Sequence, residues 1–77
     1  METDFPQRYR RLGLKIAYFR KLAGLTQAQL AERVDISPAF LGQVEAPSIV
    51  CGISLETLFK IARELDVPPS KLLEDAD

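Results

Sequence analysis

The side chains of this chain that could do chemistry are suited to binding rather than to catalysis. Cys51 is the single cysteine, and the sequence contains no histidine to act as its base. A lone cysteine forms no intramolecular disulfide and, without histidine, no zinc site. Scattered carboxylates such as Glu32, Glu56 and Glu64 are typical of solvated helix faces. We therefore expect no enzyme, no metal, no cofactor and no small-molecule substrate.

Side chains that can form hydrogen bonds instead gather around two short helical patterns in the middle of the chain. Gln27 opens the first pattern, and Ser37 and Gln43 belong to the second. Two short helices joined by a turn of three to four residues can present the second helix to the major groove of DNA. Any small helical bundle shows similar spacing, so the pattern alone leaves both readings open.

The charges are divided unevenly along the chain. Residues 1–34 hold seven basic and three acidic side chains, and residues 35–77 hold three basic and eight acidic ones. The net charge of −1 therefore hides a basic first half, which could supply a positive surface for a polyanion.

Helical periodicity and capping signals define the elements that must position these residues. Gly24 is a C-cap signal after the first helix, Thr26 with Gln29 is a capping box, and Ser37 and Ser54 are N-cap residues. Pro38 suits the first position of a helix. The expected helices cover residues 7–23, 27–34, 38–45 and 55–65, with a last turn after Pro69.

These elements predict one all-α domain, a compact five-helix bundle over residues 1–77 with flexible ends at residues 1–6 and 74–77. A chain of 77 residues has room for a single small core. No apolar run approaches the roughly 18 residues that span a bilayer, and the N-terminus lacks the apolar core of a secretory signal. We expect a cytoplasmic protein with no membrane contact.

Three spaced motifs cover most of the chain. They are LGLKIAYFRKLAGLTQAQLAERVDIS, then LGQVE, then SLETLFKIARELDVPPSKLL, and together they span about residues 12–73. These motifs resemble the helix-turn-helix domains of the phage repressor and Cro class, the XRE family. The resemblance implies a sequence-specific regulator that binds double-stranded DNA. It also implies that residues 27–34 form the positioning helix and residues 38–45 the recognition helix.

The resemblance also assigns expected roles to individual residues. Gln27 would hold a phosphate, although it could equally be a solvated residue at the first position of its helix. Separately from the resemblance, the distribution of basic residues suggests Lys15, Lys21 and Arg33 as further phosphate contacts. The base contacts would come from the recognition helix, namely Ser37, Pro38, Ala39, Phe40 and Gln43. Gln43 could pair with adenine, whereas Ala39 and Phe40 could only touch a thymine methyl, and Phe40 could equally be a core aromatic.

Arg20 and Glu45 match an ion pair of the family that ties the first helix to the end of the recognition helix. We expect a fixed, partly buried bridge, in which the loss of one partner would strand the other charge. The alternative is two unrelated, solvated side chains.

The chain departs from the family pattern after the recognition helix. Where the family usually has a glycine-containing basic loop, this chain has EAPSIVCGIS, which carries no base, and Asp35 replaces the turn glycine. Weak non-specific binding follows, so we expect a homodimer on two half-sites as the working unit.

The apolar loop residues Ile49, Val50, Cys51 and Ile53 leave two alternatives. They could fold back over the core, or they could form a subunit or partner interface. The uncharged loop and the acidic second half also favour a rival function, a protein-interaction module that keeps the fold without binding DNA.

Overall fold

The computed structural model describes residues 2–74, which form five helices and no strand. The expected all-α, five-helix bundle is confirmed, and every helix lies within one or two residues of its predicted position. The ends expected to be flexible fall partly outside the described residues, at 1 and 75–77. No helix within residues 2–74 combines the length and the apolarity that crossing a membrane requires. The helices are α1 Pro6–Leu22, α2 Gln27–Arg33, α3 Pro38–Glu45, α4 Leu55–Glu64 and α5 Pro69–Leu73.

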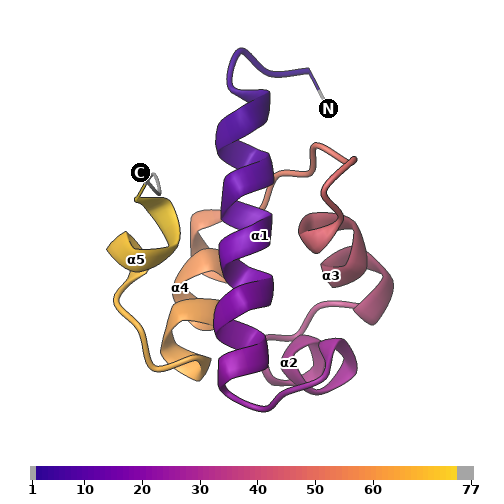
Figure 1. The fold of residues 1–77 in the computed structure, drawn as a ribbon. Helices are drawn as coiled ribbons and strands as arrows, with labels where there is room; N and C mark the ends of the chain where they lie inside the picture. Colours follow the sequence, from indigo (N-terminus) through magenta and orange to yellow (C-terminus); the bar gives the residue numbers. More distant parts are fainter. Residues whose placement is uncertain (1, 75–77) are drawn as a thin grey trace.

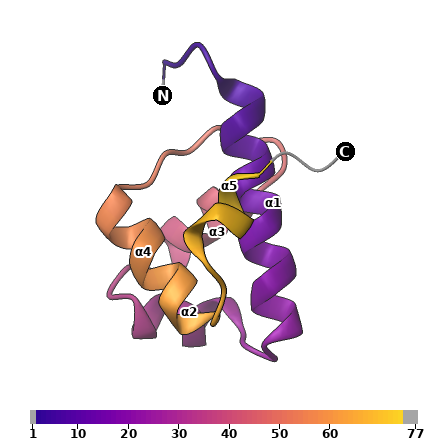
Figure 2. The ribbon, with the colours of Figure 1, turned by 90° about the vertical axis from the view of Figure 1, so that its left-hand side faces the viewer.

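Helix α1 is the central element of the bundle. Figure 1 shows it between α2 and α3 on one side and α4 and α5 on the other. It packs against α3 and α5, while α2 contacts both α3 and α4. Seen from the opposite side of the bundle from α3, α5 lies between α4 and α1 (Figure 2). The long first helix and α2 are therefore the main elements that hold α3 in place.

The core draws at least one fully buried side chain from every helix. These side chains are Ile16, Leu30, Leu41, Ile61 and Leu72, one from each helix in order. Each helix is too short or too polar to be stable alone, so the shared burial stabilises all five together.

The N-terminal ends of the middle helices carry the predicted caps. Thr26 and Gln29 form a reciprocal capping box, with Gln29 N donating to Thr26 Oγ1 over 3.1 Å and Thr26 N donating to Gln29 Oε1 over 2.9 Å. The Ser37 and Ser54 hydroxyls accept from the backbone N–H groups three residues further on. These caps fix where α2, α3 and α4 begin.

Three helices end in the same way, with one residue in the left-handed conformation. The residues are Gly24 after α1, Asp35 after α2 and Asp66 after α4, with φ angles of 74°, 60° and 57°. In each case the backbone N–H of the residue after the left-handed one donates to the carbonyl oxygen five positions earlier, as in Leu25 N to Arg20 O over 3.1 Å. This is the Schellman arrangement, and it turns the chain sharply enough to join α2 and α3 within four residues.

Candidate nucleic-acid interface

Helix α3 has one buried face that fixes it on the bundle. Leu41 and Val44 are almost completely buried, and they face the side chains of α1 and α2. Ser37 caps the helix by accepting from Phe40 N over 3.0 Å, and Pro38 occupies the first helical position. The start, the length and the inward face of α3 are therefore set by its own sequence.

An ion pair ties the end of α3 to α1. The Arg20 guanidinium donates from Nε to Glu45 Oε2 over 2.8 Å and from Nη2 to Glu45 Oε1 over 2.9 Å. Its Nη1 donates to the Leu25 carbonyl over 2.8 Å, which also ties down the turn before α2. Arg20 and Glu45 are only 8% and 7% exposed. The two-pronged geometry orients both side chains as well as attracting them.

Gln27 completes this network from the first position of α2. Its Nε2 donates to Glu45 Oε1 over 3.0 Å. Glu45 therefore accepts hydrogen bonds from α1 and α2 while belonging to α3, and no buried side-chain nitrogen or oxygen in residues 2–74 lacks a hydrogen-bond partner. The sequence had suggested Gln27 only as a phosphate ligand, and did not predict this bond. One N–H of the Gln27 amide remains for another partner.

Gly13 is a second determinant of the position of α3, and the sequence reasoning missed it. A Cβ atom on Gly13 would overlap the carbonyl group of Val44, so the backbones of α1 and α3 touch at this point. The only local signal is an isolated glycine inside a helical pattern, which usually has a packing reason. Gly13 and the ion pair thus fix α3 from the same helix, about two turns apart.

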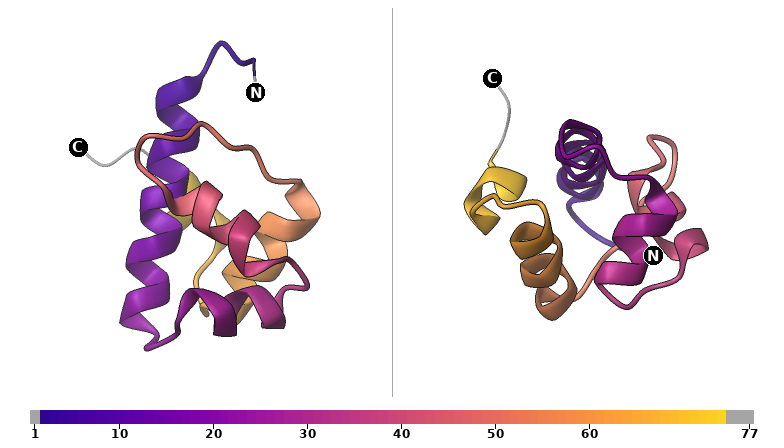
Figure 3. Two further views of the ribbon diagram at one scale, coloured as in Figure 1. Left: turned by 90° about the vertical axis from the view of Figure 1, so that its right-hand side faces the viewer. Right: turned by 90° about the horizontal axis from the view of Figure 1, so that it is seen from below.

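The outward face of α3 is a short ridge. Ala39 and Gln43 are both exposed and stand four residues apart, on the side opposite the buried Leu41. Pro38 is exposed beside them at the start of the helix. In Figure 3 (left), α3 runs across the front of the molecule with α2 below it. Within residues 2–74, Ala39 and Gln43 remain exposed on this helix.

The other two expected base contacts have structural roles as well. Ser37 is exposed, but its oxygen already accepts the capping bond. Phe40 is half-buried and packs against the core, which agrees with the core alternative, and its contact with a base stays a prediction. The ridge residues Ala39 and Gln43 are the ones left without an internal partner.

The expected phosphate ligands lie on different sides of the bundle. Lys21 is exposed on the α1 face that includes Gly13 and Ala17, each four residues apart, and this face adjoins α3. Lys15 falls instead on the face of Leu12, which lines a hollow with α5. Lys15 therefore does not stand beside α3. Arg33 is exposed at the end of α2, just before the turn into α3.

Comparison with known proteins decides the nature of this site. Residues 16–49, which run from the middle of α1 through α2 and α3, match the family model described as helix-turn-helix. This match agrees with the resemblance of these residues to the XRE-type helix-turn-helix. No curated protein sequence matches the chain significantly.

Solved structures of bacterial regulators share the fold of this XRE-type domain. The restriction-modification controller protein C.AhdI from Aeromonas hydrophila is 28% identical, with a TM-score of 0.75, over 83% of this chain and 94% of that one. The clp gene regulator ClgR from Corynebacterium glutamicum is 28% identical, with a TM-score of 0.78, over 84% and 67%. The biofilm regulator SinR of Bacillus subtilis, solved in complex with DNA, is 28% identical, with a TM-score of 0.74, over 82% and 98%.

The loop between α3 and α4, which carries no basic residue, covers part of the core. Cys51 and Ile53 pack against the buried cluster, and Val50 is half-buried. Ile49 is 41% exposed. The fold-back alternative therefore describes most of the loop, and Ile49 is the residue left for a partner.

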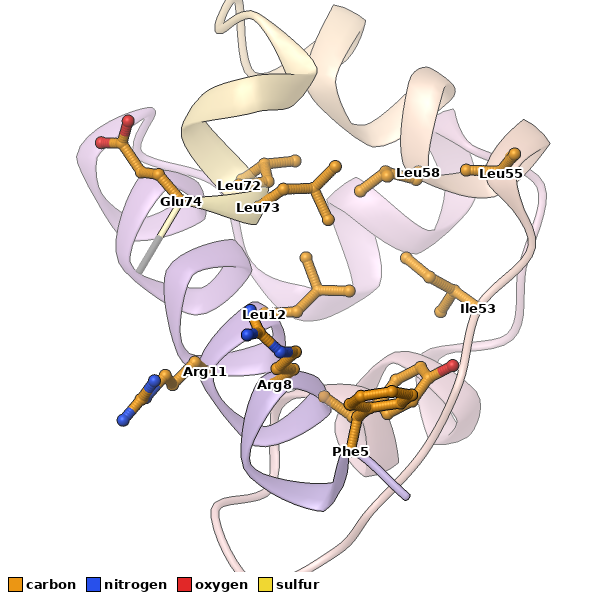
Figure 4. A pocket seen from close by; sticks show the side chains of 11 residues that line it. Phe5, Arg8, Arg11, Leu12, Ile53, Leu55, Leu58, Leu72, Leu73 and Glu74 are labelled. Carbon is orange, nitrogen blue, oxygen red and sulfur yellow. The ribbon is translucent and has the colours of Figure 1, made fainter. Parts of the chain in front are cut away.

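An apolar hollow of about 330 Å³ lies on the side away from the recognition helix. The start of α1, the start of α4 and the end of α5 form its walls, and leucine side chains from all three point into it (Figure 4). Phe5, Leu55 and Leu73 at its edge are each more than half exposed. Arg8, Tyr9, Arg11 and Glu74 also line the hollow, so charged and polar side chains accompany its apolar surface.

Proposed function

We propose that this protein is a sequence-specific, DNA-binding transcription regulator in which α3 enters the major groove. The observation that carries the proposal is the uncovered ridge of Ala39 and Gln43 on a helix that α1 holds through Arg20, Glu45 and Gly13. A rigid helix with one free face is what major-groove reading requires. SinR, which shares the fold, has been solved in complex with DNA, and this supports DNA binding by the present protein.

Gln43 is the proposed reader of a base edge. Its exposed amide has both a donor and an acceptor, which match the N7 and N6 groups of adenine. A good pair of this kind contributes about 1–3 kcal/mol of discrimination against a wrong base. Ser37, Pro38, Ala39 and the exposed part of Phe40 would lie beside it at the groove.

The proposed phosphate contacts are few, which makes binding weak for a single copy. Lys21 and Arg33 flank α3, and Gln27 has one amide hydrogen to offer. Lys15 is left out because it follows Gly13, which touches α3, by two residues and so falls on nearly the opposite face of α1. Each phosphate that is neutralised adds about 0.9 to the slope of log affinity against log salt, so this protein should show a shallow slope.

A homodimer on two half-sites would compensate for this weakness, because two linked contacts multiply their effects. The exposed Phe5, Leu55 and Leu73 around the apolar hollow supply surface for a subunit contact away from the DNA. We expect Leu73→Glu to lower the dimer fraction in analytical ultracentrifugation without changing the fold. An unchanged dimer fraction would place the contact elsewhere.

The experiment that tests the proposal is a selection from a random duplex library, followed by anisotropy titration of the enriched sequence at two salt concentrations. We expect a roughly palindromic site containing A·T pairs, with affinity that falls at the higher salt. Gln43→Ala should weaken binding by about 1–3 kcal/mol per half-site. Gln7→Ala changes an exposed glutamine at the start of α1, is the matched control and should bind normally.

A second candidate function is protein interaction, and one feature of α1 favours it. Leu14, Tyr18 and Leu22 are each about half exposed or more and follow one another at four-residue spacing, which makes an apolar stripe on the outer face. A selection that enriches no sequence, with weak binding to any duplex, would favour this candidate over DNA regulation.

A further inference from the structure

The polar groups available on α3 are unusually few for a recognition helix. Among its eight residues only Gln43 and Glu45 have side chains that form strong hydrogen bonds. Glu45 is buried and accepts three such bonds from Arg20 and Gln27. Gln43 is therefore the one residue within α3 that can form a hydrogen bond to a base edge.

The first residues of α3 expose mainly carbon atoms on the side proposed to face the groove. Pro38 and Ala39 are exposed, and Phe40 adds the part of its ring that the core does not cover. The Ser37 oxygen beside them is bound to Phe40 N, which leaves its hydroxyl hydrogen as the only further donor. Over about one turn of helix, the surface is thus largely apolar.

An apolar surface discriminates sharply among base edges in the major groove. Adenine, guanine and cytosine expose polar atoms there, and a polar atom pressed against carbon loses its water without gaining a partner. The C5-methyl group of thymine is the apolar feature of those edges. Because 5-methylcytosine has a methyl group on the same ring carbon, it offers the same surface.

From this geometry we infer that Pro38 and Ala39 form a recognition site for the C5-methyl groups of pyrimidines, with Gln43 reading an adjacent base pair. The inference rests on the proposed DNA-binding function and specifies the ligand chemistry of its central contact. It predicts that binding depends on thymine methyl groups. It also predicts that 5-methylcytosine can stand in for thymine at the contacted position.

The test uses the whole 77-residue protein and the duplex obtained by selection. Each thymine is replaced singly by deoxyuridine, which removes the methyl group and nothing else. At one or two positions per half-site we expect binding about fourfold weaker, the value of one buried methyl-sized group. At those positions 5-methylcytosine paired with guanine should bind at least fourfold more tightly than unmodified cytosine paired with guanine.

Variants of the ridge show whether the effect comes from these residues. With Ala39→Gly, the penalty for deoxyuridine at the contacted position should become clearly smaller, because only Pro38 remains to touch the methyl group. Ala39→Ser, which keeps a better helix former, repeats the test if the glycine variant melts early. Gln43→Ala should lower affinity but leave the penalty for deoxyuridine unchanged.

The outcomes separate this inference from the function on which it rests. Enrichment of a specific site with no penalty for deoxyuridine at any position would overturn the methyl-recognition site while leaving the regulator intact. A penalty that keeps its full size in the Ala39→Gly variant would also overturn it. Binding without any sequence preference would overturn both.

Discussion

Gly13 in α1 and the carbonyl group of Val44 in α3 approach so closely that no side-chain carbon fits between them. Glycine inside a helix costs about 0.5–1 kcal/mol relative to alanine. The chain accepts that cost where α1 crosses the recognition helix, and gains a backbone-to-backbone contact. The position of α3 is therefore set by rigid main-chain atoms as well as by flexible side chains.

Gly13→Ala should lower the free energy of unfolding by about 1–3 kcal/mol, because the added methyl group has to displace main-chain atoms of α3. Urea unfolding followed by circular dichroism measures this change. Gly42→Ala is the matched control, since its Cβ would meet only Gln27 Oε1 at 3.7 Å. That substitution should raise stability by about 0.5–1 kcal/mol. Equal stabilities for the two variants would contradict the close approach.

Arg20 and Glu45 should show strong coupling in a double-mutant cycle. Removal of one partner leaves a buried charge unpaired and costs about 3–5 kcal/mol, whereas replacement of both by methionine leaves no charge behind. We therefore expect Arg20→Met and Glu45→Met each to destabilise the protein severely and the double variant to recover much of the loss. Additive effects in thermal unfolding would show that the pair behaves as two independent side chains.

Asp66 occupies a left-handed position after α4, with a φ of 57°. Asp66→Gly should raise the free energy of unfolding by about 0.5–1 kcal/mol, because glycine adopts this conformation without a steric penalty. Lys60→Gly, in the interior of α4, should instead lower it by about 1 kcal/mol. Melting temperatures of the two variants should therefore move in opposite directions from that of the parent protein.

Lys21 and Lys15 allow a paired test of which side of α1 faces DNA. Lys21→Ala should reduce the slope of log affinity against log salt by about 0.9, the contribution of one phosphate. Lys15→Ala should leave the slope unchanged, because Lys15 shares the α5 side of α1 with Leu12. Both substitutions remove one positive charge, so net charge alone cannot produce a difference. Equal slopes would place the DNA differently from our proposal.

Most of the fold was predictable because its signals are local. Thr26 with Gln29, and Ser37 before Pro38, are motifs of a few neighbouring residues, and the structure places helix starts at each. The contact between Gly13 and Val44 was not predictable, because it joins residues 31 positions apart and depends on how two helices cross. The hydrogen bond from Gln27 to Glu45 escaped prediction for the same reason.

In the candidate site, too, the features set by local sequence were predictable and those set by tertiary packing were not. The exposed positions of α3 follow from helical periodicity once Leu41 is assigned to the core, so Ala39 and Gln43 could be named from sequence. Which side of α1 adjoins α3 depends on tertiary packing. The sequence therefore could not show that Lys21 lies on that side and Lys15 does not. The sequence also could not show whether the loop containing Ile49 packs on the core, because that depends on how much of the core the helices leave uncovered.

Different residues of α3 attach the helix to the bundle and face outward, so the outward residues can be changed without loosening the helix. Leu41, Val44 and Glu45 attach it to the bundle, and none of these side chains belongs to the outward ridge of Ala39 and Gln43. Substitutions on the ridge therefore leave the attachment intact. A library that randomises only those two ridge positions should yield folded proteins throughout, each with its own operator preference, so this small domain is a ready scaffold for reprogramming DNA specificity.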